Sequence, residues 1–400
     1  MSWKKKFAGN WGRLGMKCKL SDICGFRKGK VDVSNLTLKT YISTENMLPN
    51  KGGITVASSL PTVQLTQEYK KGDVLVSNIR PYFKKIWQAK NDGGCSNDVL
   101  VFQGNSNIDG DFLYYILAND DFFVYSMATS KGTKMPRGDK TSIMQYEVPV
   151  FDVDTQRKIA SVLRCLDEKI ELNSAINKNL EQQAQAIFKS WFVDFEPFNG
   201  KMPHDWIASR LGDIASIKTN SFSPVKNPGA QLEHYSIPAY DEQKYPVFES
   251  AAGVKSNKYI LSKNSVMISK LNPDTKRVWR PMCLSDLAVS STEFIIFEAF
   301  NPAYRDFVFS IIDSAAFSDW MCAHTTGSTN SRQRTAPSAT LEFQVALPDE
   351  KVITDFCAIV TPMYDTIASN ICENQKLAQL RDSILPKLMS GELDVSDIDF

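Results

Sequence analysis

The chain repeats itself, and the repeat constrains the fold more than any other feature of the sequence. VLVSNIRP (74–81) matches VMISKLNP (266–273) at an offset of 192 residues. Further matches keep the same order in both halves: 20–23 with 211–214, Trp87 with Trp279, 98–102 with 293–297, Gly132 and Arg137 with Gly327 and Arg332, and 156–163 with 353–360. The offset drifts only from 191 to 197, and chance similarities would not stay collinear. The sequence therefore predicts two copies of one unit, roughly 1–199 and 200–400.

Each copy begins with a long segment of mixed character. Short β-type runs such as DVLVFQG (98–104) alternate with helix-like stretches such as FLYYILANDDFFVYSMA (112–128), with Gly, Pro and Asn between them. This alternation is typical of an α+β domain. We therefore expect four segments along the chain: a globular domain over 1–150, a long helix over 151–199, a second globular domain over 200–347 and a second long helix over 348–400.

The two segments that close the copies have the pattern of coiled-coil helices. No Pro or Gly occurs from 154 to 193, and seam residues recur there in a 4-3-4-3 series. The series returns 197 residues later, with Arg381 as its charged exception, and Pro362 is expected to kink or break the second helix. The seam positions near the two helix centres are Leu166, Ile170, Asn173, Asn177 and Leu180, and Ile367, Asn370, Asn374 and Leu377.

The order of the segments favours antiparallel pairing of these helices. The first helix leads from the first domain to the second and forms a rod of roughly 60 Å, so the simplest second helix returns beside it. Pairing about the seam centres puts Asn173 beside Asn374 and Asn177 beside Asn370. An amide facing an amide is satisfied in an apolar seam, and such a layer fixes the register. The alternative is that the helices bend apart there and the amides are solvated.

The chain carries no recognisable catalytic or cofactor motif. Nucleotide-binding glycine loops and the common hydrolase and kinase motifs are missing, and SNIRPYF (77–83) only superficially resembles the Asn-Pro-Pro-Tyr box of amino-methyltransferases. Eight scattered cysteines form no C-x-x-C pair, and the three histidines have no cysteine or carboxylate at ligand spacing. No apolar run approaches the roughly 18 residues of a membrane span. We expect a cytoplasmic protein with no catalytic residue, metal, cofactor or membrane contact.

Positive charge is concentrated in the first globular domain. Residues 1–150 contain 21 Lys and Arg against 13 Asp and Glu, whereas 348–400 contain 4 against 10. Basic residues mix with aromatic ones and with Gly-containing loops at matched places in both copies, which suits contacts to phosphate or to a guanine edge. The candidate DNA-binding residues are Arg80, Tyr82, Lys84, Lys85, Lys131, Thr133, Lys134, Arg137 and Lys140 in the first copy, and Lys276, Arg277, Arg280, Ser328, Arg332 and Arg334 in the second. The alternative is that these are ordinary solvated loops.

Two segments resemble conserved parts of a known family, the specificity (S) subunits of Type I restriction-modification systems. QRKIASVLRCLDEKIELNSAINKNLEQQAQAIFKSWFVDFEPF (156–198) resembles the central conserved helix of that family, and LRDSILPKLMSGELDV (380–395) its C-terminal one. The resemblance implies two target recognition domains that each read one half of a bipartite, asymmetric site on double-stranded DNA. It also implies helices that form an antiparallel spacer.

The same resemblance implies partners. Modification subunits, expected to be two, would dock on the helices, bring S-adenosylmethionine and methylate adenine N6, and a restriction subunit would join where the system also cleaves DNA. This chain itself would have no catalytic activity. The alternative function is a coiled-coil adaptor that holds two protein-binding lobes apart without DNA, which would leave the basic lobe and the matched Gly and Arg loops unexplained.

Overall fold

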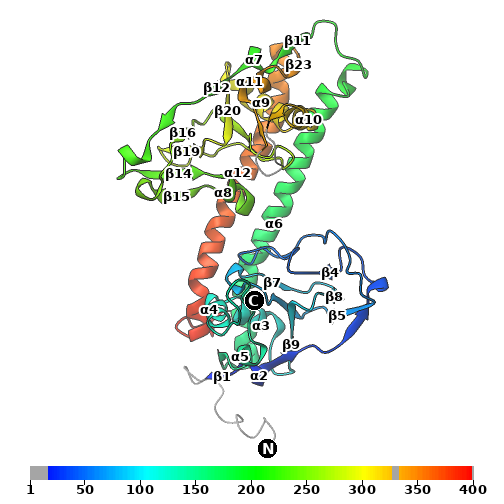
Figure 1. Ribbon diagram of the computed structural model, residues 1–400, viewed down its shortest axis with the longest axis vertical. Helices are drawn as coiled ribbons and strands as arrows, with labels where there is room; N and C mark the ends of the chain where they lie inside the picture. The colour runs from blue at the N-terminus through cyan, green and yellow to red at the C-terminus, as the bar shows by residue number, and fades with distance from the viewer. Residues whose placement is uncertain (1–16, 327–332, 399–400) are drawn as a thin grey trace, which may run out of the picture. The chain divides into compact units, whose positions relative to one another are not determined.

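The computed structural model describes residues 17–326 and 333–398 (Figure 1). The chain divides into two compact units: Met1–Ile170 with Lys376–Phe400 form unit 1, and Glu171–Gln375 forms unit 2. Each unit holds one globular lobe, lobe 1 before α6 (Val153–Phe192) and lobe 2 between α6 and α12 (Glu350–Ser390). Both long helices contribute one half to each unit. The two segments with a coiled-coil pattern are therefore helical, as their period predicts.

Lobe 1 is built from two small sheets with short helices beside them. Its elements are α2 (Leu20–Ile23), α3 (Gly110–Ala118), α4 (Asp120–Ala128) and α5 (Lys140–Ile143), and the strand pair β1 (Lys17–Lys19) and β10 (Glu147–Pro149). One sheet has the order β2 (Cys24–Phe26), β9 (Val99–Gly104), β6 (Val74–Ser77), β7 (Ile86–Gln88). The other has the order β3 (Lys30–Asp32), β5 (Leu65–Tyr69), β8 (Gly93–Cys95), β4 (Tyr41–Ile42).

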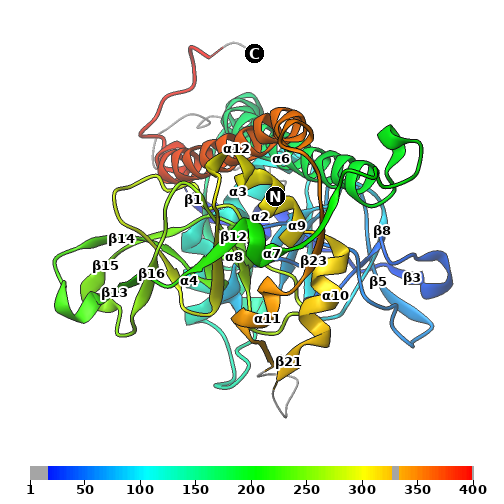
Figure 2. The same cartoon turned by 90° about the horizontal axis from the view of Figure 1, so that it is seen from above.

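Lobe 2 repeats this plan. Its helices are α7 (Leu211–Ile214), α8 (Ile237–Gln243), α9 (Arg305–Ile312), α10 (Ala315–Ala323) and α11 (Pro337–Leu341), and its strand pairs are β11 (Ile207–Arg210) with β23 (Gln344–Leu347) and β21 (Thr325–Thr326) with β22 (Arg334–Thr335). One sheet has the order β12 (Ala215–Lys218), β20 (Phe294–Ala299), β17 (Ser265–Ser269), β18 (Val278–Trp279). The other has the order β13 (Ser221–Phe222), β16 (Lys258–Ile260), β19 (Ala288–Ser291), β14 (Gln231–Tyr235), β15 (Val247–Ser250) and lies away from α12 in both views (Figure 2).

The strand orders of the two lobes correspond one to one. The sheet β2-β9-β6-β7 matches β12-β20-β17-β18, and β3-β5-β8-β4 matches β13-β16-β19-β14, to which lobe 2 adds β15. The lobes also share a parallel strand pair, β4 with β8 in lobe 1 and β14 with β19 in lobe 2. The internal repeat and the α+β class predicted from the sequence are thus confirmed, because a shared topology at matched positions does not arise from local composition.

The core of each unit includes residues of both long helices. In unit 1 Phe112 and Phe102 of the lobe pack in one cluster with Leu163 of α6 and Leu388 of α12, all of them buried. In unit 2 the cluster joins buried residues of the lobe, of α6 and of α12: Phe297 and Phe307, Ala184 and Phe192, and Ile353, Phe356 and Val360. Burying such side chains stabilises a fold by roughly 1.5–3 kcal/mol each, so neither lobe has a complete core without the helices.

In unit 2 the helices run antiparallel through a layer of asparagines. Nδ2 of Asn173 donates to Oδ1 of Asn374 at 2.9 Å, and Nδ2 of Asn370 donates to Oδ1 of Asn177 at 2.8 Å. Asn173 is only 1% exposed. These are the two pairs that antiparallel alignment about the seam centres predicts. Asn173 also donates to Glu373, so the layer is satisfied on both sides.

In unit 1 the charged exception of the seam is paired with a buried carboxylate. Nη1 of Arg381 lies 2.6 Å from Oδ1 of Asp167, and both side chains are about 15% exposed. The hydroxyl of Tyr115 in α3 donates to the other carboxylate oxygen at 2.7 Å. Burial opposes the charge of Arg381, but the carboxylates of Asp167 and Asp382 outweigh it and raise the pKa of the guanidinium above its ordinary value.

The break expected at Pro362 does not occur. α12 is one continuous helix from Glu350 to Ser390 and contains both Pro362 and Pro386. A proline inside a helix costs about 3 kcal/mol. Phe356, Val360 and Tyr364 are buried on both sides of Pro362, and this packing offsets the cost.

We predict that the asparagine pairs are energetically coupled. Asn173→Leu or Asn374→Leu alone removes the hydrogen bond between the two amides and sets a leucine against the remaining one, which should lower the free energy of unfolding by about 1–3 kcal/mol. The double variant removes both amides and should lose clearly less than the sum of the single changes. Urea denaturation measures the coupling, with Asn179→Leu on the exposed face of α6 as the control. Additive losses would contradict the pairing.

We also predict that Arg381→Met destabilises unit 1 by about 3–5 kcal/mol, because it leaves the carboxylate of Asp167 buried without its cation. The double variant Asp167→Leu/Arg381→Met should recover most of this loss. Arg157→Met is the matched control, since its guanidinium is 64% exposed and pairs with Asp154 at 3.4 Å on the surface of α6. Thermal denaturation decides, and equal losses from the two arginine changes would show that the buried pair has no special role.

Candidate nucleic-acid interface

In lobe 1 the structure brings together two loops that are about 50 residues apart in the sequence. The backbone N–H of Arg80 donates to the carbonyl of Pro136 at 2.8 Å, and that of Gly138 donates to the carbonyl of Asn78 at 3.2 Å. A β-bridge joins Ile79 to Arg137. We call residues 78–85 with 130–140 loop pair 1. It contains all nine candidate DNA-binding residues of the first copy.

The first loop of the pair is a strained turn. Arg80 and Lys84 adopt left-handed backbone angles, with φ of 51° each, on either side of a 3₁₀ turn over Pro81–Phe83. A non-glycine residue in this region costs of order 1 kcal/mol or more, and such strain is concentrated at functional sites. The turn exposes two adjacent aromatic rings, Tyr82 at 48% and Phe83 at 37%.

Three lysines of loop pair 1 form ion pairs or hydrogen bonds within the lobe. Lys84 pairs with Asp120 at 2.7 Å, and Lys131 pairs with Asp139 at 2.5 Å. The hydrogen bond from Lys131 is the main cause that lowers the pKa of Asp139 to about 2. Lys85 donates to the carbonyl of Thr44 at 2.6 Å, and burial lowers its pKa.

Other members of loop pair 1 are open to solvent. Thr133, Lys134 and Lys140 are exposed, and the ammonium of Lys140 lies 5.9 Å from the ring centre of Phe26. Arg137 is 56% exposed and lies 3.2 Å from a carboxylate oxygen of Asp98. Their charged and polar groups are therefore accessible from solvent.

Lobe 2 has the equivalent pair of loops. Asn272 donates its backbone N–H to the carbonyl of Gln333 at 2.9 Å, and Thr335 donates to that of Lys270 at 3.1 Å. A β-bridge joins Leu271 to Arg334. We call residues 270–277 with 325–335 loop pair 2. Two of the candidate DNA-binding residues, Ser328 and Arg332, lie outside the described residues.

The bridges correct one detail of the sequence alignment. Arg137 bridges Ile79 in lobe 1, and Arg334 bridges Leu271 in lobe 2, where Ile79 and Leu271 are equivalent by the offset of 192. The alignment had matched Arg137 with Arg332. The structural counterpart of Arg137 is Arg334, because the offset has already grown to 197 before this loop ends.

Four candidate residues of lobe 2 pair with carboxylates, and one of them is Arg334, which lies 2.9 Å from Glu293. Lys276 lies 2.7 Å from Asp313, and Arg277 lies 2.6 Å from Asp241. Arg280 lies 2.7 Å from Asp306 and 2.8 Å from Asp365, and its side chain is 10% exposed. Because two carboxylates already neutralise Arg280 inside the fold, its geometry fits a structural contact better than a DNA contact. The sequence alone does not reveal these partners, since they come from α8, α9, the residue after α9, and α12.

Buried polar atoms without a partner gather at the same turn in both lobes. Among the described residues, four buried side-chain N or O atoms lack a hydrogen-bond partner, and three of them are Oδ1 of Asn78, Nε of Arg80 and Oδ1 of Asn272. Arg80 and Asn272 are equivalent by the offset of 192, and both have positive φ. Unsatisfied groups are rare in folded proteins and are retained mainly where a site needs them.

A polar hollow next to loop pair 1 was not found from the sequence. It has a volume of about 430 Å³ and is lined mainly by hydroxyl and amide side chains between residues 41 and 61, together with Ser96 and Asp98. Thr44, which accepts the hydrogen bond from Lys85, is part of its lining. The only sequence signal was a run of small polar residues, which is typical of any loop.

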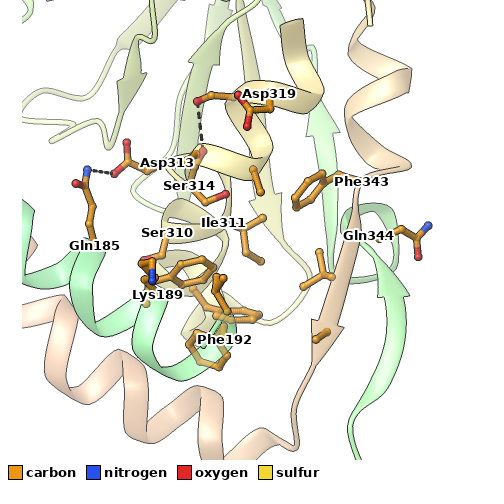
Figure 3. A pocket seen from close by; sticks show the side chains of 18 of the residues that line it. Gln185, Lys189, Phe192, Ser310, Ile311, Asp313, Ser314, Asp319, Phe343 and Gln344 are labelled. Carbon is orange, nitrogen blue, oxygen red and sulfur yellow. Dashed lines mark hydrogen bonds between the residues drawn. The ribbon is translucent and has the colours of Figure 1, made fainter. Parts of the chain in front are cut away.

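Unit 2 contains a second, larger hollow of about 650 Å³ that is mostly apolar (Figure 3). Phe192 of α6, Ile311 of α9 and Phe343 line it, and Gln185 donates to Asp313 at 2.7 Å at its rim. Its lining shows no nucleophile paired with a base, which is the arrangement that covalent catalysis requires.

In unit 1 the equivalent place is filled and retains only about 10 Å³. Arg381 and Tyr115 line it there, whereas the offsets of 197 and 195 place Ala184 and Ser310 at these positions in unit 2. Tyr115 and Asp167 of unit 1 correspond to Ser310 and Tyr364 of unit 2, so the tyrosine stands on the other member of the pair.

Within the described ranges, 17–326 and 333–398, no three His, Cys, Asp or Glu side chains are grouped so as to hold a metal ion. Within the same ranges, no helix is long and apolar enough to cross a membrane.

Known proteins match nearly the whole chain. Residues 15–182 match the family described as the Type I restriction modification DNA specificity domain. The chain is 24% identical to the HindI specificity subunit of Haemophilus influenzae, over 94% of this chain and 98% of the relative. It is 23% identical to the MjaIX specificity subunit of Methanocaldococcus jannaschii, over 92% of this chain and 88% of the relative.

A solved structure has a similar fold. The crystal structure of the Type-I restriction-modification system S subunit from M. genitalium shares the fold, with a TM-score of 0.56 at 15% identity and coverage of 94% of this chain and 97% of that chain. The resemblance that the two helix motifs predicted is thereby confirmed. Both relatives are described as specificity subunits of Type I restriction enzymes.

We predict that Arg334 controls the ionisation of Glu293. The hydrogen bonds from Arg334 hold the pKa of Glu293 below its ordinary value against the opposing effect of burial. Arg334→Ala should therefore raise this pKa, and acid should release the guanidinium in the wild type by protonating the carboxylate. NMR titration of labelled glutamate side chains over about pH 3–7 measures the shift. Arg210→Ala, at an exposed ion pair with Glu342, is the control; a Glu293 pKa unchanged by Arg334→Ala would refute the contact.

Proposed function

The chain is a relative of the specificity subunits of Type I restriction enzymes, and from this relationship we propose that it is the non-catalytic DNA sequence-recognition subunit of such a complex. One observation carries the proposal beyond the relationship: both lobes present the same construction of two joined loops with an exposed arginine. Lysines and arginines on loops supply contacts to phosphates and to base edges in the grooves of double-stranded DNA.

Each lobe reads one half of a bipartite site in this proposal. The two loop pairs share their backbone contacts but differ in side chains, since Tyr82 and Phe83 of lobe 1 correspond to Asp274 and Thr275 of lobe 2 by the offset of 192. Loop pairs with the same backbone contacts but different side chains are expected to read different bases in the two half-sites. The two half-sites should therefore differ, and the complete site should not be palindromic.

The long helices set the spacing and bind the partners in this proposal. Apolar side chains are exposed on the helix surfaces, with Leu172 and Ile176 of α6 at 55% and 38%, and Ile359 and Leu380 of α12 at 40% and 48%. Exposed apolar side chains on a polar helix surface suit contact with another protein. The partners are modification subunits that carry S-adenosylmethionine, two of them as the family resemblance implies, joined by a restriction subunit where the system cleaves. The complex acts in the cytoplasm, where the host DNA lies.

The deciding experiment compares the methylated adenines of the host genome with and without this gene. We expect methylation of a bipartite, non-palindromic motif to disappear on deletion and to return when the wild-type gene is restored. The purified complex should bind this motif with an affinity that falls steeply with salt, because phosphate contacts release counterions.

An unchanged methylome together with no salt-dependent DNA binding by the assembled complex would overturn the proposal. That result would favour an adaptor that holds protein-binding lobes, and the apolar hollow of unit 2 would then be the first surface to examine.

A further inference from the structure

The two lobes hold one arginine in the same structural position. Arg137 and Arg334 each form a β-bridge to the residue two positions after the buried strands β6 and β17, namely Ile79 and Leu271. The hydrogen bonds around the bridge are shared as well. Ser77 donates from Oγ to the carbonyl of Ile79, and Ser269 donates to that of Leu271, at 3.1 Å in both lobes. These backbone contacts therefore hold the Cα atoms of the two arginines at equivalent positions in the two lobes.

Each of these arginines is also held by a carboxylate at an equivalent position. Asp98 directly precedes β9, and Glu293 directly precedes β20, and these two strands are counterparts in the two lobes. Arg137 lies 3.2 Å from Asp98. Arg334 donates from Nε and Nη2 to the two carboxylate oxygens of Glu293 at 2.9 and 3.0 Å. A planar group held at both of these nitrogens cannot turn freely.

The held guanidinium groups still have donors to offer. A guanidinium has five N–H donors, so the two that Glu293 uses leave three on Arg334. Arg334 is 43% exposed and Arg137 is 56% exposed, so the remaining N–H groups are accessible to a ligand. Two parallel N–H donors match a pair of acceptors, either two phosphate oxygens or O6 and N7 of guanine.

We propose that Arg137 and Arg334 are equivalent DNA contacts, one in each half-site, and that each binds a pair of acceptors while Asp98 and Glu293 orient it. The proposal rests on the function proposed above and deepens it, because it names the contact that the two lobes share. Asp98 and Glu293 are positioning residues, since they act through the arginines.

Stability alone does not explain this recurrence. An ion pair between exposed side chains contributes about 0–1 kcal/mol, so a fold gains little from keeping the same pair twice. The rest of the turn differs between the lobes, whereas the arginine, its carboxylate and its bridge are present in both. The unsatisfied buried atoms of Asn78, Arg80 and Asn272 lie on the loops that meet these arginines.

The test uses the full chain assembled with its modification subunits and the motif identified in the methylome. Arg137→Ala and Arg334→Ala should each weaken binding to this motif by about 10–100-fold at fixed salt, as loss of a bidentate contact does. Arg210→Ala is the matched control, because Arg210 is 51% exposed and lies 3.1 Å from Glu342, yet it belongs to β11 and to neither loop pair. It should change the affinity less than about twofold.

Further variants distinguish the two kinds of acceptor. Arg334→Lys keeps the charge but loses the paired donors, so it should retain most of the affinity if the acceptor is a phosphate, and should relax one base of one half-site if it is a guanine. Glu293→Gln should weaken binding less than Arg334→Ala. Its effect should vanish when Arg334 is already Ala, which a purely structural role of Glu293 would not produce.

The outcomes separate this inference from the function on which it rests. If the wild-type complex binds no motif, the proposed function fails. If the wild-type complex binds but Arg137→Ala and Arg334→Ala behave like Arg210→Ala, this inference alone is overturned. If Arg332→Ala weakens binding and Arg334→Ala does not, the equivalence of Arg334 with Arg137 at the DNA is wrong.

Discussion

Two buried amide pairs fix how the long helices meet in unit 2, and the rest of that unit depends on them. Asn173 faces Asn374 and Asn177 faces Asn370. An amide set against a leucine would be desolvated without a partner, so any shift along the seam is penalised. With the register fixed, Ile353 of α12 reaches the same core as Phe192 of α6 and the inner side chains of lobe 2. The lobe is therefore completed by the helices.

The two units differ in the side chains that lie where the globular lobe packs on the long helices. Unit 1 accommodates a charge in its seam by pairing Arg381 with Asp167 and by adding the hydroxyl of Tyr115. Unit 2 has alanine and serine at two of the equivalent positions, and a weaker contact of 3.2 Å between Ser310 and Tyr364 takes the place of the tyrosine–aspartate bond. The hollow beside the pair in unit 1 measures about 10 Å³, and the apolar hollow that Ser310 and Tyr364 line in unit 2 measures about 650 Å³. The two halves thus share a topology without sharing their surfaces.

Arginines of this fold differ in how many carboxylates they contact and in how accessible they are. Arg280 is enclosed by Asp306 and Asp365, whereas Arg137 and Arg334 each meet one carboxylate and stay accessible. An enclosed guanidinium has its donors satisfied, and an accessible one that is held on one side is oriented for a ligand. The same contrast separates Lys85, which is bound to the carbonyl of Thr44, from the exposed Lys134. The fold thus leaves only some of its cationic side chains accessible to solvent.

The sequence by itself determined the repeat, the mixed lobes, the two helices and the asparagine pairs, because periodicity and collinear matches are one-dimensional properties of the chain. It also pointed to the loops that carry exposed cations. Only the tertiary structure decided that Arg334 is the counterpart of Arg137, that Arg280 is enclosed and that α12 continues through Pro362. These outcomes depend on a two-residue change of loop length, on carboxylates from distant helices, and on packing around Phe356 and Tyr364 that outweighs the local cost of a proline. Contacts between segments far apart in the chain leave no local pattern in the sequence.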